Sequence, residues 1–565
     1  MDMKELEKTN MWALYEKCQN FMYLRNIYSD TDRNYRMYNG DQWYGLKIKG
    51  IEKIQYNFIK PIIKHKVSTI TSNLFAVNYS PENIENPEFM EIAQKTCDLL
   101  NKKASKVFDK DFLDKKIKKW AKQAAINDEA VAYVDYDTTD NMPINEIISK
   151  NDIMFGDENE DEIQLQPWIL IRQRKTIIEL QEIARKNGVS EEEIQNIRGD
   201  NDTHTSSGED AKYEIEDKCW LLTKLYRKNG TIHFSQSTKY VDIKKDTDTG
   251  LSLYPVAHWN WESQEGNARG IGEVRQLIPN QLETNKTAMR RALSVKNTAY
   301  PQKVINVDAI QNPGDADRVG ATIRFKDMGN TRASDVFMNT TPAQMSTDSE
   351  RFQTELIQYS KDLNDSSDAT TGNINPEQAS GRAILAVQQA QNQPLTDQTI
   401  GLKSFIEDLA RIWFDMWKVY ASDGLRVELN DTDYMTGLTN TTIESVPSYI
   451  LDALSTSVKV DITPKGAYDR YAQELSLENM LTSGQITFDE YVDSLDPDSV
   501  MPKTKLENIK KKRAQAQEQI NRINEQAQLL QQQAMLNYSN QQEINNIGEQ
   551  GEELINQYLG NQVTA

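Results

Sequence analysis

The sequence is poor in the residues that active-site chemistry most often needs. It has 4 histidines and 3 cysteines among 565 residues. None of the histidines, His65, His204, His233 and His258, lies at metal-ligand spacing from another histidine or from a cysteine. There is no GxxxxGKS/T phosphate loop, no GxGxxG dinucleotide fingerprint and no GxSxG nucleophile elbow. We therefore expect no catalytic residues, no metal and no cofactor.

Long apolar runs and paired cysteines are also absent. No stretch approaches the roughly 18–20 apolar residues that span a bilayer. The charged start MDMKELEKTN lacks the apolar segment of a secretory signal. Cys18, Cys97 and Cys219 lie far apart, with no CxxC pair. We therefore expect a soluble chain with no membrane partner, made in a reducing cytoplasm.

Positive charge is in short supply. Lys and Arg total 65 against 85 Asp and Glu, which gives a net charge of −20 at pH 7. This balance argues against a basic protein that binds nucleic acid tightly. It suits a channel through which DNA slides, because each cation paired with a phosphate adds affinity. One basic run, KKIKKW at 115–120, lies in a helical pattern. It is either a solvated helix face or a contact to a partner or to DNA.

What the sequence has instead is a series of three long helical patterns in its middle. They cover about residues 272–296, about 342–363, and 376–420 with a break near Pro394. Pro279 predicts a kink or a later start in the first helix. The stripe of the second helix is typical of a helix packed along another helix. The apolar stripes are Ile271, Val274, Ile278, Leu282, Met289 and Leu293 in the first helix; Phe352, Leu356, Tyr359 and Leu363 in the second; and Phe405, Leu409, Ile412, Met416 and Tyr420 in the third.

A small β-type module separates the first two helices. Residues 302–307 and 321–325 predict short strands, and Asn312, Pro313 and Gly314 predict the turn region between them. One helix that leads to a module and a second that returns from it predict a hairpin-shaped stem with a tip. This layout favours a chain that builds a long structure with its neighbours over one that encloses a catalytic pocket.

The flanking regions predict an α+β fold that is mainly α. Asn229 and Gly230 predict the type I′ turn of a β-hairpin, and Thr487 and Glu490 predict a helix capping box. The chain beyond about 503 is rich in Gln, Asn, Glu and Lys, which predicts a polar helix or a disordered tail. Helical patterns cover 1–45, 57–72, 88–126, 176–187, 467–482 and 488–495, and strand patterns cover 130–136, 167–174, 218–243, 425–429 and 457–462.

Short motifs in a set order make the chain resemble the portal proteins of tailed bacteriophages. The resemblance covers about residues 20–500, and the order and spacing of the motifs carry it. The motifs are YNGDQW at 38–43 and NFIKPII at 57–63, then Gly270-Ile271-Gly272-Glu273 leading to Gln276, Leu282 and Asn285, then Tyr300-Pro301, then Thr371-Gly372 and Ser380-Gly381-Arg382-Ala383-Ile384, and finally Val460-Asp461-Ile462.

The resemblance implies a portal fold with an α+β wing, a two-helix stem, a small β-containing clip and a helical crown. The implied regions are residues 1–265 for the N-terminal part of the wing, 266–299 for the first stem helix, 300–338 for the clip, 339–366 for the second stem helix, 367–465 for the tunnel loop, the long kinked helix and the returning wing strands, 466–510 for the crown, and 511–565 for the Gln-rich C-terminal helix or disordered tail.

It also implies a function and a set of partners. About twelve copies would form a ring at one capsid vertex of the virion, assembled in the host cytoplasm. Double-stranded DNA would be packaged and ejected through that ring without sequence specificity. The implied partners are the terminase, the major capsid and scaffolding proteins, and the head-tail connector. The alternative is another head-morphogenesis, scaffolding or minor capsid protein, and ring stoichiometry separates the two. A nucleic-acid enzyme is disfavoured by the missing motor and metal motifs.

Three sets of site residues follow from the resemblance. Lys286 and Arg290 are expected to face the channel; the alternative is an ion pair with an acidic residue of the neighbouring stem. Asn312, Pro313 and Gly314 are expected clip contacts. The expected tunnel loop, for which the alternative is an ordinary surface connector, comprises Asp368, Ala369, Thr370, Thr371, Gly372, Asn373, Ile374 and Asn375.

Overall fold

The computed structural model divides into two compact units, Met1–Thr463 and Pro464–Ala565. Helices hold more residues than strands, so the mixed α+β class with a mainly helical content is confirmed. The residues that the structure describes are 10–47, 52–72, 74–82, 87–199, 217–299, 303–316, 318, 320–326, 329, 332–339, 348–362, 393–433, 438–463, 476–495 and single positions beyond 504.

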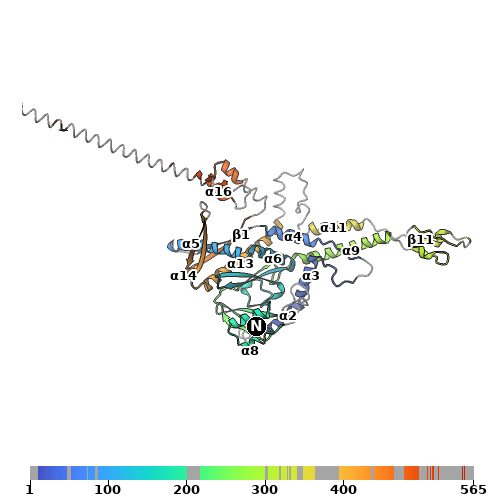
Figure 1. Cartoon of the computed structure of the whole chain (residues 1–565), viewed down its shortest axis with the longest axis horizontal. Coiled ribbons are helices and arrows are strands. Elements are labelled where there is room, and N and C mark those ends of the chain that lie inside the picture. Colours follow the sequence, from blue (N-terminus) through green and yellow to red (C-terminus); the bar gives the residue numbers. More distant parts are fainter. Residues whose placement is uncertain are drawn as a thin grey trace, which may run out of the picture. The chain divides into compact units, whose positions relative to one another are not determined.

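The first unit carries most of the described helices and all of the described strands (Figure 1). Its helices are α2 (Met11–Leu24), α3 (Ile27–Asn39), α4 (Ile59–Ile70), α5 (Pro87–Lys110), α6 (Leu113–Asn127), α7 (Ile177–Lys186), α8 (Glu191–Ile194), α9 (Glu273–Ala299), α10 (Ala333–Val336), α11 (Asp348–Asp362), α13 (Thr396–Tyr420) and α14 (Ser448–Ala453). None of the described helices is both long and apolar enough to cross a bilayer.

Its strands form two larger antiparallel sheets and three two-stranded ladders. The five-stranded sheet has the order β4 (Ile153–Phe155), β5 (Trp168–Thr176), β6 (Lys218–Lys228), β7 (Thr231–Ser237), β8 (Asp242–Asp248), and the three-stranded sheet has β3 (Met142–Ile148), β2 (Glu129–Asp137), β9 (Val256–Asn260). The ladders pair β1 (Leu74–Pro81) with β14 (Thr456–Thr463), β10 (Lys303–Ile305) with β11 (Phe337–Asn339), and β12 (Leu425–Asp433) with β13 (Leu438–Val446).

The main core lies where α6 and α13 pack against the three-stranded sheet. The predicted stripe of α13 is confirmed, because Phe405, Leu409, Ile412 and Met416 are all buried. The break that was predicted near Pro394 is a 3₁₀ turn, Gln393–Leu395, after which α13 begins. Large aromatic side chains fill the space, with the rings of Trp120 and Phe405 5.3 Å apart edge to face.

Local turn and cap signals are confirmed. Asn229 and Gly230 adopt positive φ angles of 54° and 94° in the hairpin between β6 and β7, as a type I′ turn requires. In the second unit, Thr487 and Glu490 form the predicted capping box at the start of α16 (Phe488–Ser494). Residues 476–482 of that unit are also helical.

Pairings between distant strands differ from the predictions. The strand expected at residues 321–325 is wrong: β10 pairs with β11, and Phe325 makes only an isolated bridge with Ile310. The strand β13 was missed. The helical pattern over 88–126 is two helices, divided at Phe112, whose φ angle is 51°. Residues 342–347, 363–392 and 464–475, to which helices or the tunnel loop were assigned, lie outside the described residues.

Candidate functional site at the helical hairpin

The first half of α9 is held inside the body of the first unit. Val274, Leu277 and Ile278 are buried in the main core, and α9 contacts α3, α4 and α6. From residue 291 onward its side chains are half-buried or exposed. The predicted helix is confirmed, and it continues through Pro279.

Buried amides fasten α9 to the segment that precedes α4. The Gln281 Oε1 accepts a hydrogen bond from the Phe58 backbone N–H at 3.1 Å, and its Nε2 donates to the Tyr56 carbonyl oxygen at 2.6 Å. The Asn285 Oδ1 accepts from the Tyr56 N–H at 3.0 Å, and its Nδ2 donates to Gln42 Oε1. Three of the short motifs that carry the sequence resemblance, at 38–43, 57–63 and 270–285, therefore contact one another through this set of hydrogen bonds.

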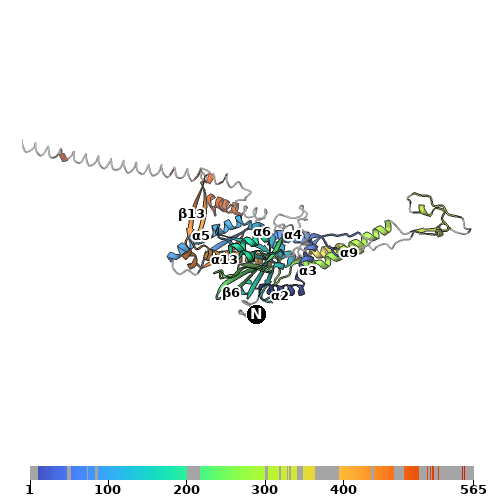
Figure 2. The same cartoon turned by 60° about the horizontal axis from the view of Figure 1, so that its bottom comes forward.

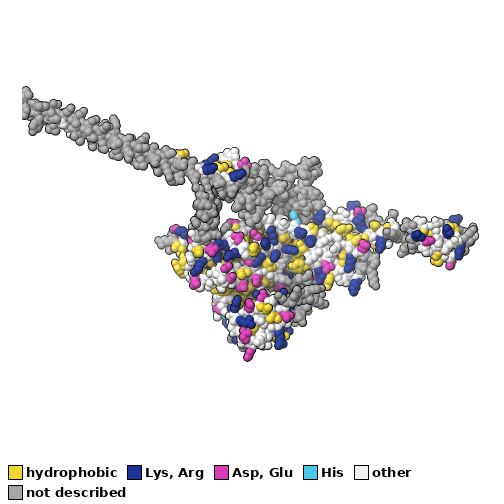
Figure 3. Space-filling model, viewed as in Figure 1, with side chains coloured by type: hydrophobic (Ala, Val, Ile, Leu, Met, Phe, Trp, Pro, Cys, Tyr) yellow, Lys and Arg dark blue, Asp and Glu magenta, His cyan; other side chains and the backbone are white. Residues whose placement is uncertain are grey.

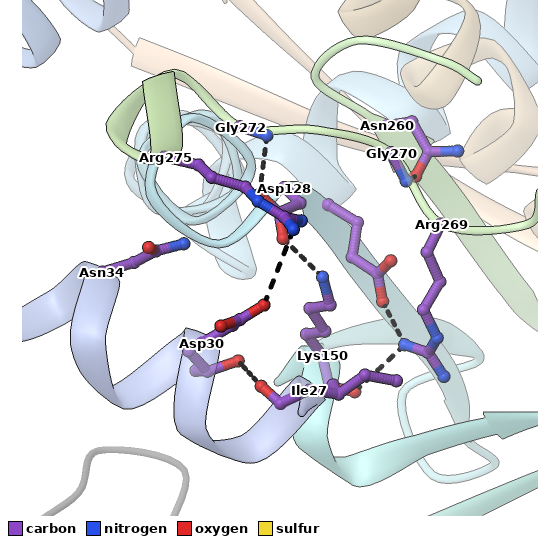
Figure 4. Close-up of polar contacts among 12 residues, drawn as sticks. Ile27, Asp30, Asn34, Asp128, Lys150, Asn260, Arg269, Gly270, Gly272 and Arg275 are labelled. Atoms are coloured by element: carbon purple, nitrogen blue, oxygen red, sulfur yellow. Dashed lines mark hydrogen bonds and ion pairs between the residues drawn. The ribbon is translucent and has the colours of Figure 1, made fainter. Parts of the chain in front are cut away.

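Two glycines allow the chain to enter α9 through a crowded space (Figure 4). The N–H of Gly272 donates to Asp128 Oδ1 at 2.6 Å, and the N–H of Gly270 donates to Asn260 Oδ1 at 3.0 Å. A Cβ at Gly270 would lie 2.6 Å from the Glu262 carbonyl oxygen, and one at Gly272 would lie 2.8 Å from the Asp128 nitrogen. No side chain larger than hydrogen fits at either position without movement of the backbone.

A buried group of charges lies beside these glycines. Arg269 pairs with Glu129 at 2.8 Å and with Glu158 at 2.9 Å. Lys150 pairs with Asp128 at 2.5 Å (Figure 4). Burial alone would raise the pKa of Glu129, but Arg269, followed by His258 and Lys150, holds that pKa at about 2. The group joins β2, the segment before β4 and the entry to α9. It therefore holds the N-terminal end of α9 against the body of the first unit. No pattern along the chain predicted this group of charges.

The helices α9 and α11 lie side by side and antiparallel (Figures 1 and 2). Their contact includes several polar pairs. Asn280 Nδ2 donates to Ser360 Oγ at 3.0 Å, and Arg291 Nη1 donates to Gln353 Oε1 at 2.9 Å. Arg291 also pairs with Glu350 at 3.4 Å. We call α9 and α11 the helical hairpin.

The apolar stripe that was predicted for α11 does not face α9. Gln353 and Ser360, seven positions apart, are buried on the face toward α9, whereas Phe352 and Tyr359 are 47% and 61% exposed. Leu356 is half-buried, and Leu363 lies outside the described residues. The face toward α9 carries these hydrogen-bonding side chains, and half-buried Ile357 packs against the main core. Packing of the apolar stripe along a helix of a neighbouring copy stays a prediction.

The two predicted channel charges are exposed and share one partner on their own helix. Lys286 Nζ lies 3.5 Å from Glu283 Oε2, and Arg290 Nη1 lies 3.0 Å from Glu283 Oε1. This pairing lies within one chain, so the channel-facing position and the pairing with a neighbouring stem both stay predictions. Glu283 neutralises part of the charge, so the three side chains together keep one net positive charge.

The small module between the hairpin helices has its own apolar core. Ala309, Ile310 and Val336 are buried in it, together with half-buried Ile305 and Ile323. The predicted turn is a 3₁₀ turn, Pro313–Asp315, in which Pro313 and Gly314 are exposed.

Asn312 holds this turn together from within. Its Nδ2 donates to Thr322 O at 2.8 Å and to Asp315 Oδ2 at 3.1 Å, and its Oδ1 accepts from the Arg324 N–H at 2.8 Å. Of the three predicted clip residues, Asn312 is therefore a structural residue, and Pro313 and Gly314 are available to a partner.

The expected tunnel loop, 368–375, lies outside the described residues. Within the described part of the chain, no three His, Cys, Asp or Glu side chains are arranged to hold a metal ion. No protein-family model matches this chain, and no curated protein matches it.

Proposed function

We propose that this chain is the subunit of a bacteriophage portal, a ring of about twelve copies at one capsid vertex of the virion. In this proposal the genome is packaged and ejected through the axis of the ring. The terminase and the head-tail connector dock on it, and the major capsid and scaffolding proteins surround it. The observation that carries the proposal is the helical hairpin: two antiparallel helices with a small β module between them and apolar side chains exposed on the outer face of α11.

The exposed apolar residues of the hairpin support assembly with further copies. Phe352, Tyr359 and Val295, which is 68% exposed, cannot be covered by the contacts that α9 and α11 make with each other. Burial of one such side chain stabilises an interface by about 1.5–3 kcal/mol. A contact between the outer face of one hairpin and a different face of the next is heterologous. Repetition of such a contact forms a ring when the rotation between successive copies closes, and an open filament when it does not.

The charge of the chain supports a channel for DNA. With a net charge of −20 in each copy, a ring holds a large negative charge that disfavours adhesion of phosphate. Within that field, Lys286 and Arg290 would form a weak belt on α9, with Glu283 limiting its strength. The portal regions assigned by sequence resemblance, wing, stem, clip and crown, belong to this proposal.

Native mass spectrometry of the purified full chain, with negative-stain images of the same sample, tests the proposal. We expect a single species of about twelve subunits with a central hole. The measurement should be repeated at several salt concentrations, because charge repulsion between acidic subunits weakens at high salt. A monomer or dimer at every salt concentration would reject the proposal, and an open filament would favour a scaffolding protein.

A further inference from the structure

A lysine-rich surface covers α4 and α6, which pack against each other in the body of the first unit. The four α6 lysines follow the spacing i, i+3, i+4, i+7, which places them on one side of the helix. The opposite side of α6, with Ile117, Trp120 and Ala121, is buried. We call this surface the lysine face; its members are Lys60 and Lys64 of α4 and Lys115, Lys118, Lys119 and Lys122 of α6.

The two helices contribute to one continuous surface. The ammonium groups of Lys60 and Lys122 lie 5.8 Å and 4.9 Å from the centre of the same Tyr38 ring. Lys64 is one helical turn after Lys60. Partial burial lowers the pKa of Lys122, and the nearby ammonium groups of Lys60 and Lys64 lower it further. The like charges are therefore close enough to repel one another.

Acidic residues do not balance this charge. The helix α4 contains no acidic residue, and α6 contains only Asp114. In the part of the chain that the structure describes, none of the six lysines forms an ion pair, whereas their neighbours Lys116 and Lys66 pair with Asp111 and Glu273. Figure 3 shows Lys and Arg side chains gathered over this region. This unbalanced basic surface contrasts with the net charge of −20 of the whole chain.

We infer that the lysine face binds the phosphate backbone of double-stranded DNA without sequence specificity. The α6 lysines extend over about 10 Å, a length that faces several phosphates of a duplex. Lysine is a point charge that contacts phosphate, and neither helix supplies an arginine, the side chain that most often reads guanine. Lysine is also depleted at protein–protein interfaces, which disfavours a protein partner. The choice of DNA rests on the proposed function, whereas the choice of an anion rests on the lysines alone.

The test is fluorescence anisotropy of the full chain with a fluorescein-labelled duplex of about 20 base pairs, which is longer than the lysine face. The variant Lys115→Gln/Lys118→Gln/Lys119→Gln/Lys122→Gln removes the α6 part of the face. A matched control, Lys17→Gln/Lys95→Gln/Lys186→Gln/Lys245→Gln, removes the same charge from exposed lysines elsewhere. A third variant with arginine at the four α6 positions keeps the charge.

We expect the wild-type affinity to fall with salt between 50 and 200 mM NaCl, with a log–log slope of about −4 to −5. The α6 glutamine variant should bind at least about tenfold more weakly at 50 mM, with a slope smaller by about 3 to 4. The control and the arginine variant should bind within about threefold of wild type. Equal binding by the glutamine variant and the control, or no binding by wild type at 50 mM, would overturn the inference.

Native masses of the same samples keep the two proposals distinct. If the chain forms rings and the α6 glutamine variant binds DNA as tightly as wild type, the portal proposal is retained and the lysine face is rejected as a DNA site. If the chain stays monomeric and the α6 glutamine variant loses DNA affinity, the lysine face is retained and the portal proposal is rejected. If the α6 glutamine variant alters the assembly mass but not the DNA affinity, the lysine face is a contact between acidic copies of this chain and the inference fails.

Discussion

Lys66 of α4 and Glu273 in the first turn of α9 form an ion pair of 2.7 Å, with side chains only 8% and 11% exposed. The second carboxylate oxygen of Glu273 accepts a hydrogen bond from Trp261 Nε1 at 3.0 Å. The charge at the start of α9 is thus matched by one residue more than 200 positions earlier in the chain. This pair fixes the helical hairpin to the body.

The first prediction concerns removal of one partner from this pair. Lys66→Met should lower the free energy of unfolding by about 3–5 kcal/mol, because it leaves a buried carboxylate uncompensated. The double variant Lys66→Met/Glu273→Gln should recover part of that loss. Urea denaturation followed by Trp fluorescence measures both. The control is Lys95→Met, which removes the exposed pair with Glu91 and should cost less than about 1 kcal/mol. If Lys66→Met lowered the free energy of unfolding by as little as Lys95→Met, the ion pair of Lys66 and Glu273 would not be a buried, stabilising pair.

The second prediction concerns the glycine entry to α9. Gly270→Ala and Gly272→Ala should each destabilise the chain by about 2–4 kcal/mol, because the added Cβ would meet backbone atoms closer than 3.0 Å. Gly314→Ala is the control, since nothing lies within 4 Å of its added Cβ. Thermal unfolding of the three variants provides the comparison. Equal melting temperatures would show that the entry segment tolerates side chains.

The third prediction concerns acid. Glu129 has a pKa of about 2, below its ordinary value of 4.5, so its stabilising effect is complete above pH 4.5 and is lost as the pH falls toward 2. The effect is on the order of 3 kcal/mol. The stability difference between wild type and Glu129→Gln should therefore shrink as the pH falls from 5 to about 2. Urea midpoints across this range, with surface variant Glu91→Gln as the control, give the measurement. If the stability difference between wild type and Glu129→Gln stays constant over this pH range, Glu129 is not the group that titrates.

The fourth prediction concerns the module between the hairpin helices. Asn312→Ala removes three hydrogen bonds and should destabilise this module locally by about 2–3 kcal/mol. Limited proteolysis should then cut within 303–339 faster, while the body stays intact because the module has a separate core. Gln311→Ala, an exposed neighbour, serves as the control. Unchanged cleavage in Asn312→Ala would indicate that its side chain does not support the turn.

The fifth prediction concerns the outer face of α11. Phe352→Asp/Tyr359→Asp should leave the folded monomer as stable as wild type, because both side chains are exposed in the single chain. It should also prevent assembly into the proposed ring. The control, Ile178→Asp/Tyr240→Asp, changes two residues elsewhere that are even more exposed, and it should assemble normally. Native mass spectrometry distinguishes them, and normal rings from the α11 variant would place the subunit contact on another surface.

Local patterns predicted those elements whose cause is local. The apolar stripe of α13 predicted a buried helix, and it is buried because Phe405, Leu409 and Ile412 recur on one face. Asn229 and Gly230 predicted their turn because few other residues adopt two successive positive φ angles. In both cases a few neighbouring residues decide the conformation.

Long-range pairing was not predictable from the same signals. The strand β10 pairs with β11 and not with 321–325, because the choice depends on which segment completes the small core around Ile310 and Val336. The burial of Gln353 and Ser360 on the face of α11 toward α9 was not predicted, because no spacing along the chain reveals their hydrogen-bond partners on α9. The pairing of Arg269 with Glu129 and Glu158 joins residues more than 100 positions apart, and no spacing along the chain reveals it.

The polar seam between α9 and α11 sets how easily the hairpin can open. A hydrogen bond between protein groups is exchanged for bonds to water at a net cost of only about 0.5–1.5 kcal/mol, whereas separation of α13 from its sheet would expose several aromatic rings. Separation of α11 from α9 should therefore cost less free energy than separation of α13 from its sheet. The start of α9 is held by the buried pair between Glu273 and Lys66, whereas α11 is held to α9 through contacts that include two side-chain hydrogen bonds.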